Sequence, residues 1–121
     1  MKTKQGIDML ERVRTICEGL PEVEESVDGF GHSVMKVRGK TFIMMGENDG
    51  VAGMSFKSDK EEQSLLLQQG GYVRTPYIGQ HGWGSLDKAA SPDWGELPGL
   101  LRSAYVRAAP KRLVKQVMER E

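Results

Sequence analysis

Apolar residues recur at the spacing of an amphipathic helix near both ends of the chain. The first helix is predicted over residues 4–19, and Gly19 and Pro21 mark its end. A closing helical region begins near residues 91–93, and Pro110 separates it from a short last helix. The apolar stripe that these closing helices should bury contains Leu97, Leu100, Leu101, Ala104, Tyr105, Ala108, Leu113, Val114 and Val117.

After the first helix the pattern changes to the two-residue alternation of half-exposed strands. Ser33, Met35 and Val37 should point to one side of the first of these strands. The predicted strands cover residues 32–38, 41–45 and 51–57, with a short extended acidic stretch before them at residues 22–27. A tight turn at Gly39 and a turn-rich loop at residues 46–50 join the three strands into an antiparallel meander.

A middle helix follows the meander directly. Ser58 and Glu61 have the spacing of a capping box, so the helix should begin there. It should run to about Gln69, bury Leu65, Leu66 and Gln69, and end at the following glycine pair.

Two further short strands are expected before the closing helices, at residues 72–74 and around residues 83–87. Strands that are grouped together, with helices around them, indicate an α+β fold rather than repeated βαβ units. We therefore expect a single domain over residues 1–121, in which an antiparallel sheet with projecting hairpins packs against N-terminal, middle and C-terminal helices.

Composition narrows the possible partners. Seventeen basic and seventeen acidic residues cancel, so the chain as a whole does not attract polyanions. Cys17 is the single cysteine, which excludes an intramolecular disulfide and fits a reducing compartment. The sequence contains no apolar run of the roughly 18 residues that a membrane span needs. These features lead us to expect a cytoplasmic protein that does not bind membranes, with a monomer favoured.

Five short motifs, in this order, resemble the MmcQ/YjbR family of small bacterial proteins over nearly the whole chain. They are Leu20-Pro21 with Glu24, Gly39-Lys40 with Phe42, Ser55 with Lys57, His81 with Trp83, and Ser103 with Tyr105. The resemblance implies an α+β fold whose hairpins project as paired wings. The DNA-binding label that members of the family carry rests on this shape, and the resemblance supplies no catalytic residues and no cofactor. Residues 79–84 are richer in glycine than the family pattern, which predicts a shorter or more mobile wing.

Basic side chains in the sheet region form the first candidate site. If the hairpins lie side by side, several of these residues would converge on one surface and neutralise phosphates, with His81 or Trp83 stacking or donating a hydrogen bond. The alternative is a solvated sheet face whose lysines protect exposed strand edges. The candidate residues are Lys36, Arg38, Lys40, Lys57, Arg74, His81 and Trp83.

The C-terminal stretch is the most basic part of the chain and the segment 22–28 is its acidic counterweight. The basic residues could bind a phosphate backbone or an acidic partner. The alternative is that they place favourable charge near helix C-termini and form a solvated face. They could also form ion pairs with the acidic segment, which would cancel both patches. They are Arg102, Arg107, Lys111, Arg112, Lys115 and Arg120.

Metal and catalytic sites have little support in the sequence. His32 and His81 are the only histidines, and no pair of possible ligands has the short spacing of a metal site. No serine lies in a Gly-x-Ser-x-Gly elbow, and Gly39-Lys40-Thr41 lacks the upstream glycine of a phosphate loop. We therefore expect neither a metal nor an enzyme.

Two hypotheses remain in front. The first is a binding module whose sheet and hairpins contact an anionic partner, such as nucleic acid, through Lys40, Lys57, Arg74 and His81. The alternative is a protein–protein adaptor that uses the aromatic loop around Tyr77 and Trp83. Tyr77, which lies between Pro76 and Ile78, is the aromatic residue that we most expect to be exposed. An enzyme acting on a small anionic substrate is a third and weaker hypothesis.

Overall fold

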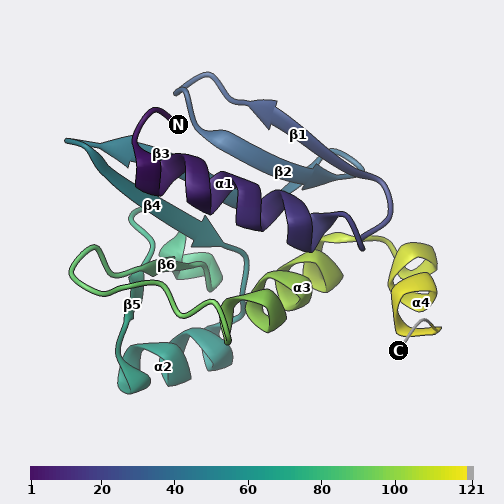
Figure 1. Ribbon diagram of the computed structural model, residues 1–121. Helices are drawn as coiled ribbons and strands as arrows, with labels where there is room; N and C mark the ends of the chain where they lie inside the picture. Colours follow the sequence, from purple (N-terminus) through teal and green to yellow (C-terminus); the bar gives the residue numbers. More distant parts are fainter. Residues whose placement is uncertain (120–121) are drawn as a thin grey trace.

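A computed structural model describes residues 1–119 as a six-stranded antiparallel sheet with four α-helices and one short 3-10 helix (Figure 1). The strands lie in the order β1-β2-β3-β4-β6-β5. The strands are β1 Val23–Val27, β2 Ser33–Val37, β3 Lys40–Asn48, β4 Val51–Phe56, β5 Tyr72–Arg74 and β6 Gly84–Leu86. The helices are α1 Lys4–Cys17, α2 Lys60–Gln69, α3 Leu97–Ala108 and α4 Lys111–Glu119, with the 3-10 helix η1 at Ile78–His81. The expected α+β architecture is confirmed.

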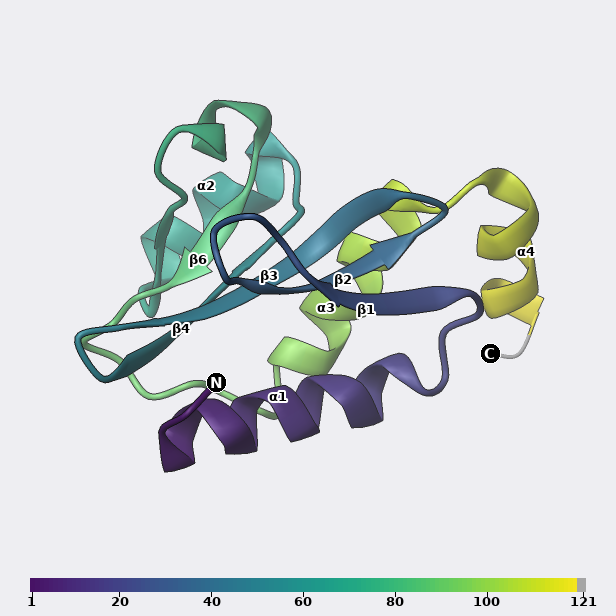
Figure 2. The same cartoon turned by 90° about the horizontal axis from the view of Figure 1, so that it is seen from above.

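The sheet has one covered face and one open face. Helices α1 and α3 pack against β3 and β4 on the covered face, and α2 packs against β5 at the end of the sheet. Figure 2 shows α1 on one side of the strands, α3 behind them, and the segment between β5 and β6 on the side away from α1. No helix among residues 1–119 is long and apolar enough to cross a membrane.

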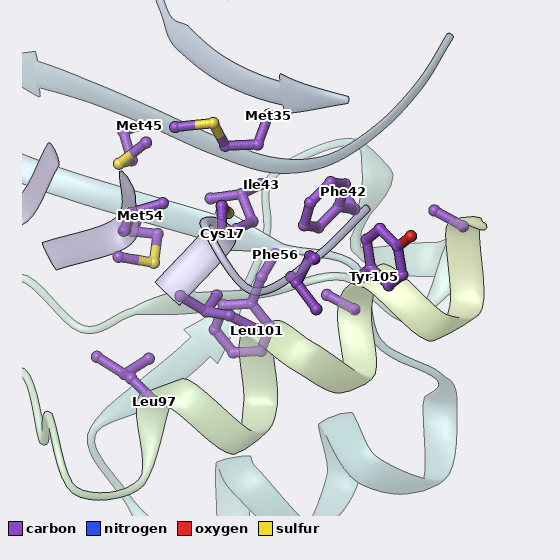
Figure 3. Close-up of a cluster of buried hydrophobic side chains, with 14 of the residues drawn as sticks. Cys17, Met35, Phe42, Ile43, Met45, Met54, Phe56, Leu97, Leu101 and Tyr105 are labelled. Carbon is purple, nitrogen blue, oxygen red and sulfur yellow. The ribbon is translucent and has the colours of Figure 1, made fainter. Parts of the chain in front are cut away.

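The hydrophobic core fills the space between the covered face and the two helices (Figure 3). Met35 and Val37 point into it from β2, and Ala52, Met54 and Phe56 point into it from β4, as the alternation predicts. The β2–β3 register shifts between Met35 and Lys36, so that β3 has one extra residue there. This bulge allows both Phe42 and Ile43 to face the core.

Tyr105 joins the last long helix to the rest of the core. Its side chain is fully buried and its ring meets Phe42 edge to face, with 5.6 Å between the ring centroids. The Tyr105 hydroxyl donates a hydrogen bond to the carbonyl of Pro21 at 2.7 Å. This bond ties α3 to the turn after α1, two segments that also carry motifs of the family resemblance.

Helix α2 begins one residue later than its capping box predicts. Asp59 is the N-cap, and its carboxylate accepts the backbone N–H of Glu62 at 2.8 Å. Ser58 instead donates its hydroxyl to the Glu62 side chain. The predicted inward face of α2 is therefore partly wrong, since Gln63 and Leu66 are buried whereas Leu65 is 60% exposed and Gln69 is exposed.

Two other boundaries differ from the expectation. Strand β3 continues to Asn48, because Asp49 and Gly50 alone supply the positive φ angles of the turn, 53° and 78°. Helix α3 begins only at Leu97, because residues 93–96 form a turn in which the Asp93 carboxylate accepts the backbone N–H groups of Gly95 and Glu96.

Within residues 1–119, the acidic segment forms ion pairs with three arginines, of which only Arg112 belongs to the C-terminal basic stretch. Glu22 accepts from Arg38 at 3.3 Å and from Arg112 at 3.0 Å, which ties α4 to the β2–β3 turn. Glu25 accepts from Arg14 of α1 at 2.7 Å. These contacts hold the pKa of both carboxyl groups below the usual range, chiefly through the arginine hydrogen bonds.

Candidate functional site

Small residues form the centre of the open face of the sheet. Gly46 of β3 lies directly opposite Gly53 of β4, and Ser55 of β4 lies directly opposite Ser85 of β6. Because side chains alternate along a strand, Gly53 and Ser55 face away from the core that Met54 enters. The missing bulk leaves a depression in the middle of the sheet.

Two loops raise the sides of this depression and convert it into a groove of about 730 Å³, which we call the open-face groove. The β1–β2 loop forms one bank with Asp28, Phe30 and His32. The segment after β5 forms the other bank with Thr75, Pro76, Tyr77 and Ile78. The rest of the lining is Met44, Met45, Gly46, Glu47, Asn48, Val51, Gly53, Met54, Ser55, Val73, Ser85, Leu86, Asp87 and Lys88. A volume of this size is typical of ligand sites.

Three hydroxyl groups form a chain across the groove floor. The oxygens of Ser55 and Ser85 are 2.7 Å apart, and those of Ser85 and Thr75 are 2.8 Å apart. Ser85 is 8% exposed and Thr75 is 6% exposed, whereas Ser55 is half-buried at the surface of the groove. The hydroxyl chain therefore reaches from the interior of the second bank to the centre of the groove.

His32 is oriented over the floor by a carboxylate. Its Nδ1 lies 3.1 Å from Asp28 Oδ2, while Asp28 Oδ1 accepts the backbone N–H groups of Phe30 and His32 at 2.9 Å each. These bonds, led by the one from the His32 backbone, lower the pKa of Asp28, so its carboxylate is ionised and can only accept. Nδ1 must then carry the proton, and in the neutral ring Nε2 is an acceptor.

The ring of His32 lies over Gly46. A Cβ atom at Gly46 would be 2.8 Å from His32 Cδ2, so only glycine allows the ring to lie there. Nε2, at 3.5 Å from the same point, is also close to the floor. In the neutral form of the ring, this nitrogen is an acceptor at the β3 side of the groove floor.

Glu47 lines the groove, but its carboxylate is hydrogen-bonded to Lys2 and Thr3, just before α1. It accepts from the Thr3 hydroxyl, from the backbone N–H of Lys2, and from the backbone N–H of Thr3 at 2.7 Å. These bonds, the Thr3 hydroxyl first, lower the pKa of Glu47 to about 2. Its charge is present at all physiological pH values, but its oxygens are already engaged.

Tyr77 projects from the second bank in a strained backbone conformation. Its φ and ψ angles are 65° and −55°, and the backbone N–H of Ile78 donates to the carbonyl of Pro76 at 2.7 Å. This geometry is a γ-turn with positive φ, which is rare and strained for a residue other than glycine. The side chain is 95% exposed, so nothing within the domain is gained from placing the ring there. Strain at an exposed aromatic residue on the rim of a groove is typical of a functional position.

Gln63 of α2 holds the second bank from below. It is 8% exposed, and its Nε2 donates to the carbonyls of Gly79 at 2.8 Å and Trp83 at 2.7 Å. The two carbonyls lie at either end of the turn that carries η1, so one amide group fixes both ends. Gln63 is thus a positioning residue for the bank that carries Tyr77.

We expect Gln63→Leu to lower the free energy of unfolding by about 1–2 kcal/mol, since both carbonyls lose a buried donor but keep one backbone partner. Urea denaturation measures this change. Gln68→Leu, the same substitution at an exposed position of α2, is the matched control and should change stability by less than about 0.5 kcal/mol. Equal effects of the two substitutions would contradict the anchoring role.

The basic residues predicted from the sequence do not gather on one surface. Lys36 and Lys57 belong to positions that face the open side, and Lys36 lies directly opposite Glu24 on β1. Arg38, in the β2–β3 turn, is ion-paired with Glu22. Lys40 is exposed and lies opposite Val37, a residue of the covered face.

The remaining predicted residues lie at the other end of the sheet. The side chains of Arg74 and Val73 point to opposite faces of β5. Arg74 packs over Gly79, where a Cβ atom would be 2.4 Å from Arg74 Cγ. His81 is exposed at the end of η1, and Trp83 is 8% exposed. The aromatic residue available at this end is therefore Tyr77, not Trp83.

The C-terminal basic residues are largely paired. Arg107 contacts Asp59 at 3.0 Å and Glu62 at 3.5 Å, and Lys115 lies 3.9 Å from Glu119. Arg112 is bound to Glu22, whereas Lys111 is exposed at the start of α4. Arg120 lies outside the described residues.

Several groove residues were missed from the sequence, above all Phe30, Thr75, Ser85 and Gly53. Their signal is the row of small or hydroxyl residues that alternates with buried apolar ones, such as Gly53 and Ser55 between Ala52, Met54 and Phe56. Across residues 1–119, no three His, Cys, Asp or Glu side chains are grouped so that they could hold a metal ion.

Comparisons with known proteins support one family. The family model described as YjbR matches residues 18–107. A Deinococcus radiodurans protein with a family-model domain named DUF419 has a similar crystal structure, with a TM-score of 0.71 and 20% sequence identity over 89% of this chain and 86% of that one. At this identity the likeness concerns the fold. No curated protein is similar enough to count as a match.

Proposed function

The chain belongs to the YjbR family, and we propose that it is a non-catalytic binding module whose open-face groove takes an extended, mostly apolar segment of a partner protein. The observation that carries this proposal is Tyr77, an almost fully exposed aromatic side chain held on the rim by a strained turn. Tyrosine is among the residues that most often dominate binding energy at protein interfaces.

The shape and lining of the groove suit such a segment. Met44 and Val73 are floor residues, and Phe30 and Tyr77, which are 88% and 95% exposed, stand on opposite banks. The floor crosses β3, β4, β6 and β5, which at normal strand spacing is about 14 Å. An extended chain of about four or five residues covers that distance.

Charge favours a partner that is not a polyanion. The ionisable lining residues are three carboxylates, Asp28, Glu47 and Asp87, against Lys88 and the imidazole of His32. A phosphate backbone would be repelled there. Of the predicted basic set, Lys36 and Lys57 occupy strand positions that face the open side. Nucleic-acid binding is therefore an outcome to test, since single-stranded DNA bound through these two lysines would weaken steeply with added salt.

The arrangement around His32 supports binding rather than catalysis. A Ser or Cys nucleophile needs a base within hydrogen-bond reach. The His32 ring forms its hydrogen bond with Asp28. Among residues 1–119, no serine hydroxyl and no cysteine thiol forms a hydrogen bond with this ring. Cys17 is buried in the core, and burial raises the pKa of its thiol to about 12, which makes it a poor nucleophile.

Gly53→Val tests the groove directly. A Cβ at Gly53 meets nothing within 4 Å, and valine favours a strand, so we expect stability to be kept or raised by up to about 1 kcal/mol. The added methyl groups occupy the groove floor, so a bound segment should lose at least about tenfold in affinity. The probe is a seven-residue peptide selected from a random library on the wild-type chain and measured by fluorescence anisotropy.

Ser26→Val is the matched control, because Ser26 lies on the same face in β1 but outside the groove. It should leave binding of the selected peptide unchanged. A library that yields no peptide, or peptides that bind Gly53→Val as well as the wild-type chain, would contradict the proposal. Salt-sensitive binding of single-stranded DNA in place of peptide would favour the nucleic-acid hypothesis.

A further inference from the structure

The hydroxyl chain on the groove floor has one hydrogen more than it uses. Ser55, Ser85 and Thr75 supply three O–H donors, and the chain contains two hydrogen bonds. Within the described part of the chain, the three hydroxyls contact no further acceptor. Whichever way the hydrogen bonds among these hydroxyls run, one O–H has no acceptor. All three residues line the groove.

The surplus donor is best used at Ser55. Ser85 and Thr75 are more than nine-tenths buried, whereas Ser55 is half-buried at the centre of the floor. When Thr75 donates to Ser85 and Ser85 donates to Ser55, the Ser55 O–H is free to point into the groove. Each hydroxyl in such a chain polarises the next, which strengthens the final donor.

The groove also presents an acceptor at a matching distance. His32 Nε2 lies over Gly46, which pairs with Gly53, and Gly53 is two residues from Ser55 on the same face of β4. Gly46 and Ser55 are thus diagonal neighbours on paired strands, whose side-chain positions are about 7–8 Å apart. The C=O and N–H of one planar trans amide point in opposite directions, so a single amide can meet a donor and an acceptor that lie on its two sides.

We infer that the ligand presents an uncharged backbone amide to the groove floor, with a carbonyl accepting from Ser55 and an N–H donating to His32 Nε2. This inference rests on the proposed function and specifies its chemistry. A carboxylate would also accept from Ser55, but the carboxylates of Asp28, Glu47 and Asp87 around the groove disfavour a further negative charge. Apolar ligand groups on either side of the amide meet Met44 and Val73.

The inference is tested with the selected seven-residue peptide, acetylated and amidated at its ends, in which each backbone amide in turn is replaced by a thioamide. Sulfur is a weak acceptor. We expect one position to be sensitive, with a loss of about fivefold in affinity. Ser55→Ala should cause a similar loss for the unmodified peptide and abolish the sensitivity of that position, because the donor retreats to Ser85.

Ser55→Thr is the matched variant, since it keeps the hydroxyl in a strand residue and should retain both the affinity and the sensitive position. Wild-type binding that depends on Gly53 but shows no thioamide-sensitive position coupled to Ser55 would overturn this inference and leave the proposed function standing. Failure to select any peptide would overturn both. Tighter binding of peptides that place Asp or Glu over Ser55 would overturn the claim that the ligand group bound there is an uncharged amide.

Discussion

Replacing Tyr77 with glycine should abolish most binding to the groove while making the domain more stable. Loss of an aromatic anchor at an interface costs about 2 kcal/mol or more, which is roughly a 30-fold loss of affinity. Glycine adopts the φ of 65° without strain, so the free energy of unfolding should rise by about 1 kcal/mol. Peptide titration and urea denaturation of the same variant measure the two effects.

Tyr77→Ala separates the ring from the backbone. Alanine removes the same side chain but keeps the strain of positive φ, so its binding loss should equal that of Tyr77→Gly without the gain in stability. Unchanged peptide affinity in both variants would show that the exposed ring is not an anchor. A glycine variant that is less stable than the alanine variant would show that the turn is not strained.

The largest loss of stability is expected from Gly82→Ala. Gly82 has φ of 94°, and a Cβ there would lie 2.8 Å from the backbone of Asp59. Backbone atoms cannot rotate away as a flexible side chain can, so η1 and the N-terminus of α2 must separate. Strain at φ and overpacking together should lower the free energy of unfolding by about 3 kcal/mol or more. Thermal or urea denaturation measures this change.

Gly99→Ala is the control for this substitution. Gly99 lies in α3 with ordinary φ, and a Cβ there meets nothing within 4 Å. Alanine favours a helix over glycine by up to about 1 kcal/mol, so the same chemical change should stabilise the domain. A Gly82→Ala variant as stable as the wild type would contradict the close packing of η1 on α2.

The contrast between these glycines shows a second role for glycine in residues 79–84. A glycine-rich stretch suggests a mobile wing, but Gly79 lies beneath Arg74 and Gly82 lies against Asp59. Gly79 allows close approach to a side chain five residues earlier, and Gly82 allows close approach between two segments that are distant in the sequence. Such contacts depend on tertiary structure and leave no local signal.

Much of the fold could be predicted, because the spacing of apolar residues along the sequence indicates which side of a helix or strand is buried. The stripe from Leu97 to Ala108 and the alternation in β2 and β4 follow directly from which residues the core accepts. The start of α2 was missed by one residue, because Ser58 and Asp59 are both good caps and only the Asp59 carboxylate reaches the Glu62 N–H.

The site was predicted less well. The sequence shows that a strand residue is charged, but it does not show which face of the sheet the side chain lies on or which residue it forms an ion pair with. Lys36 and Lys40 are close in sequence, yet a hairpin turn and strand alternation send them to opposite faces. Arg38 is bound to Glu22, which no local pattern indicates. Tyr77 was the exception, because Pro76 before it and a loop around it already predicted exposure.

Amide NMR of the isotopically labelled domain, titrated with the selected peptide, tests the central claim most directly. The account predicts shifts confined to the β1–β2 loop around His32, to β4 around Gly53 and Ser55, and to the bank around Tyr77. These shifts should vanish with Gly53→Val and persist at high salt, because the contact is apolar. Shifts centred on α3 and α4, with the open-face groove unaffected, would contradict the account.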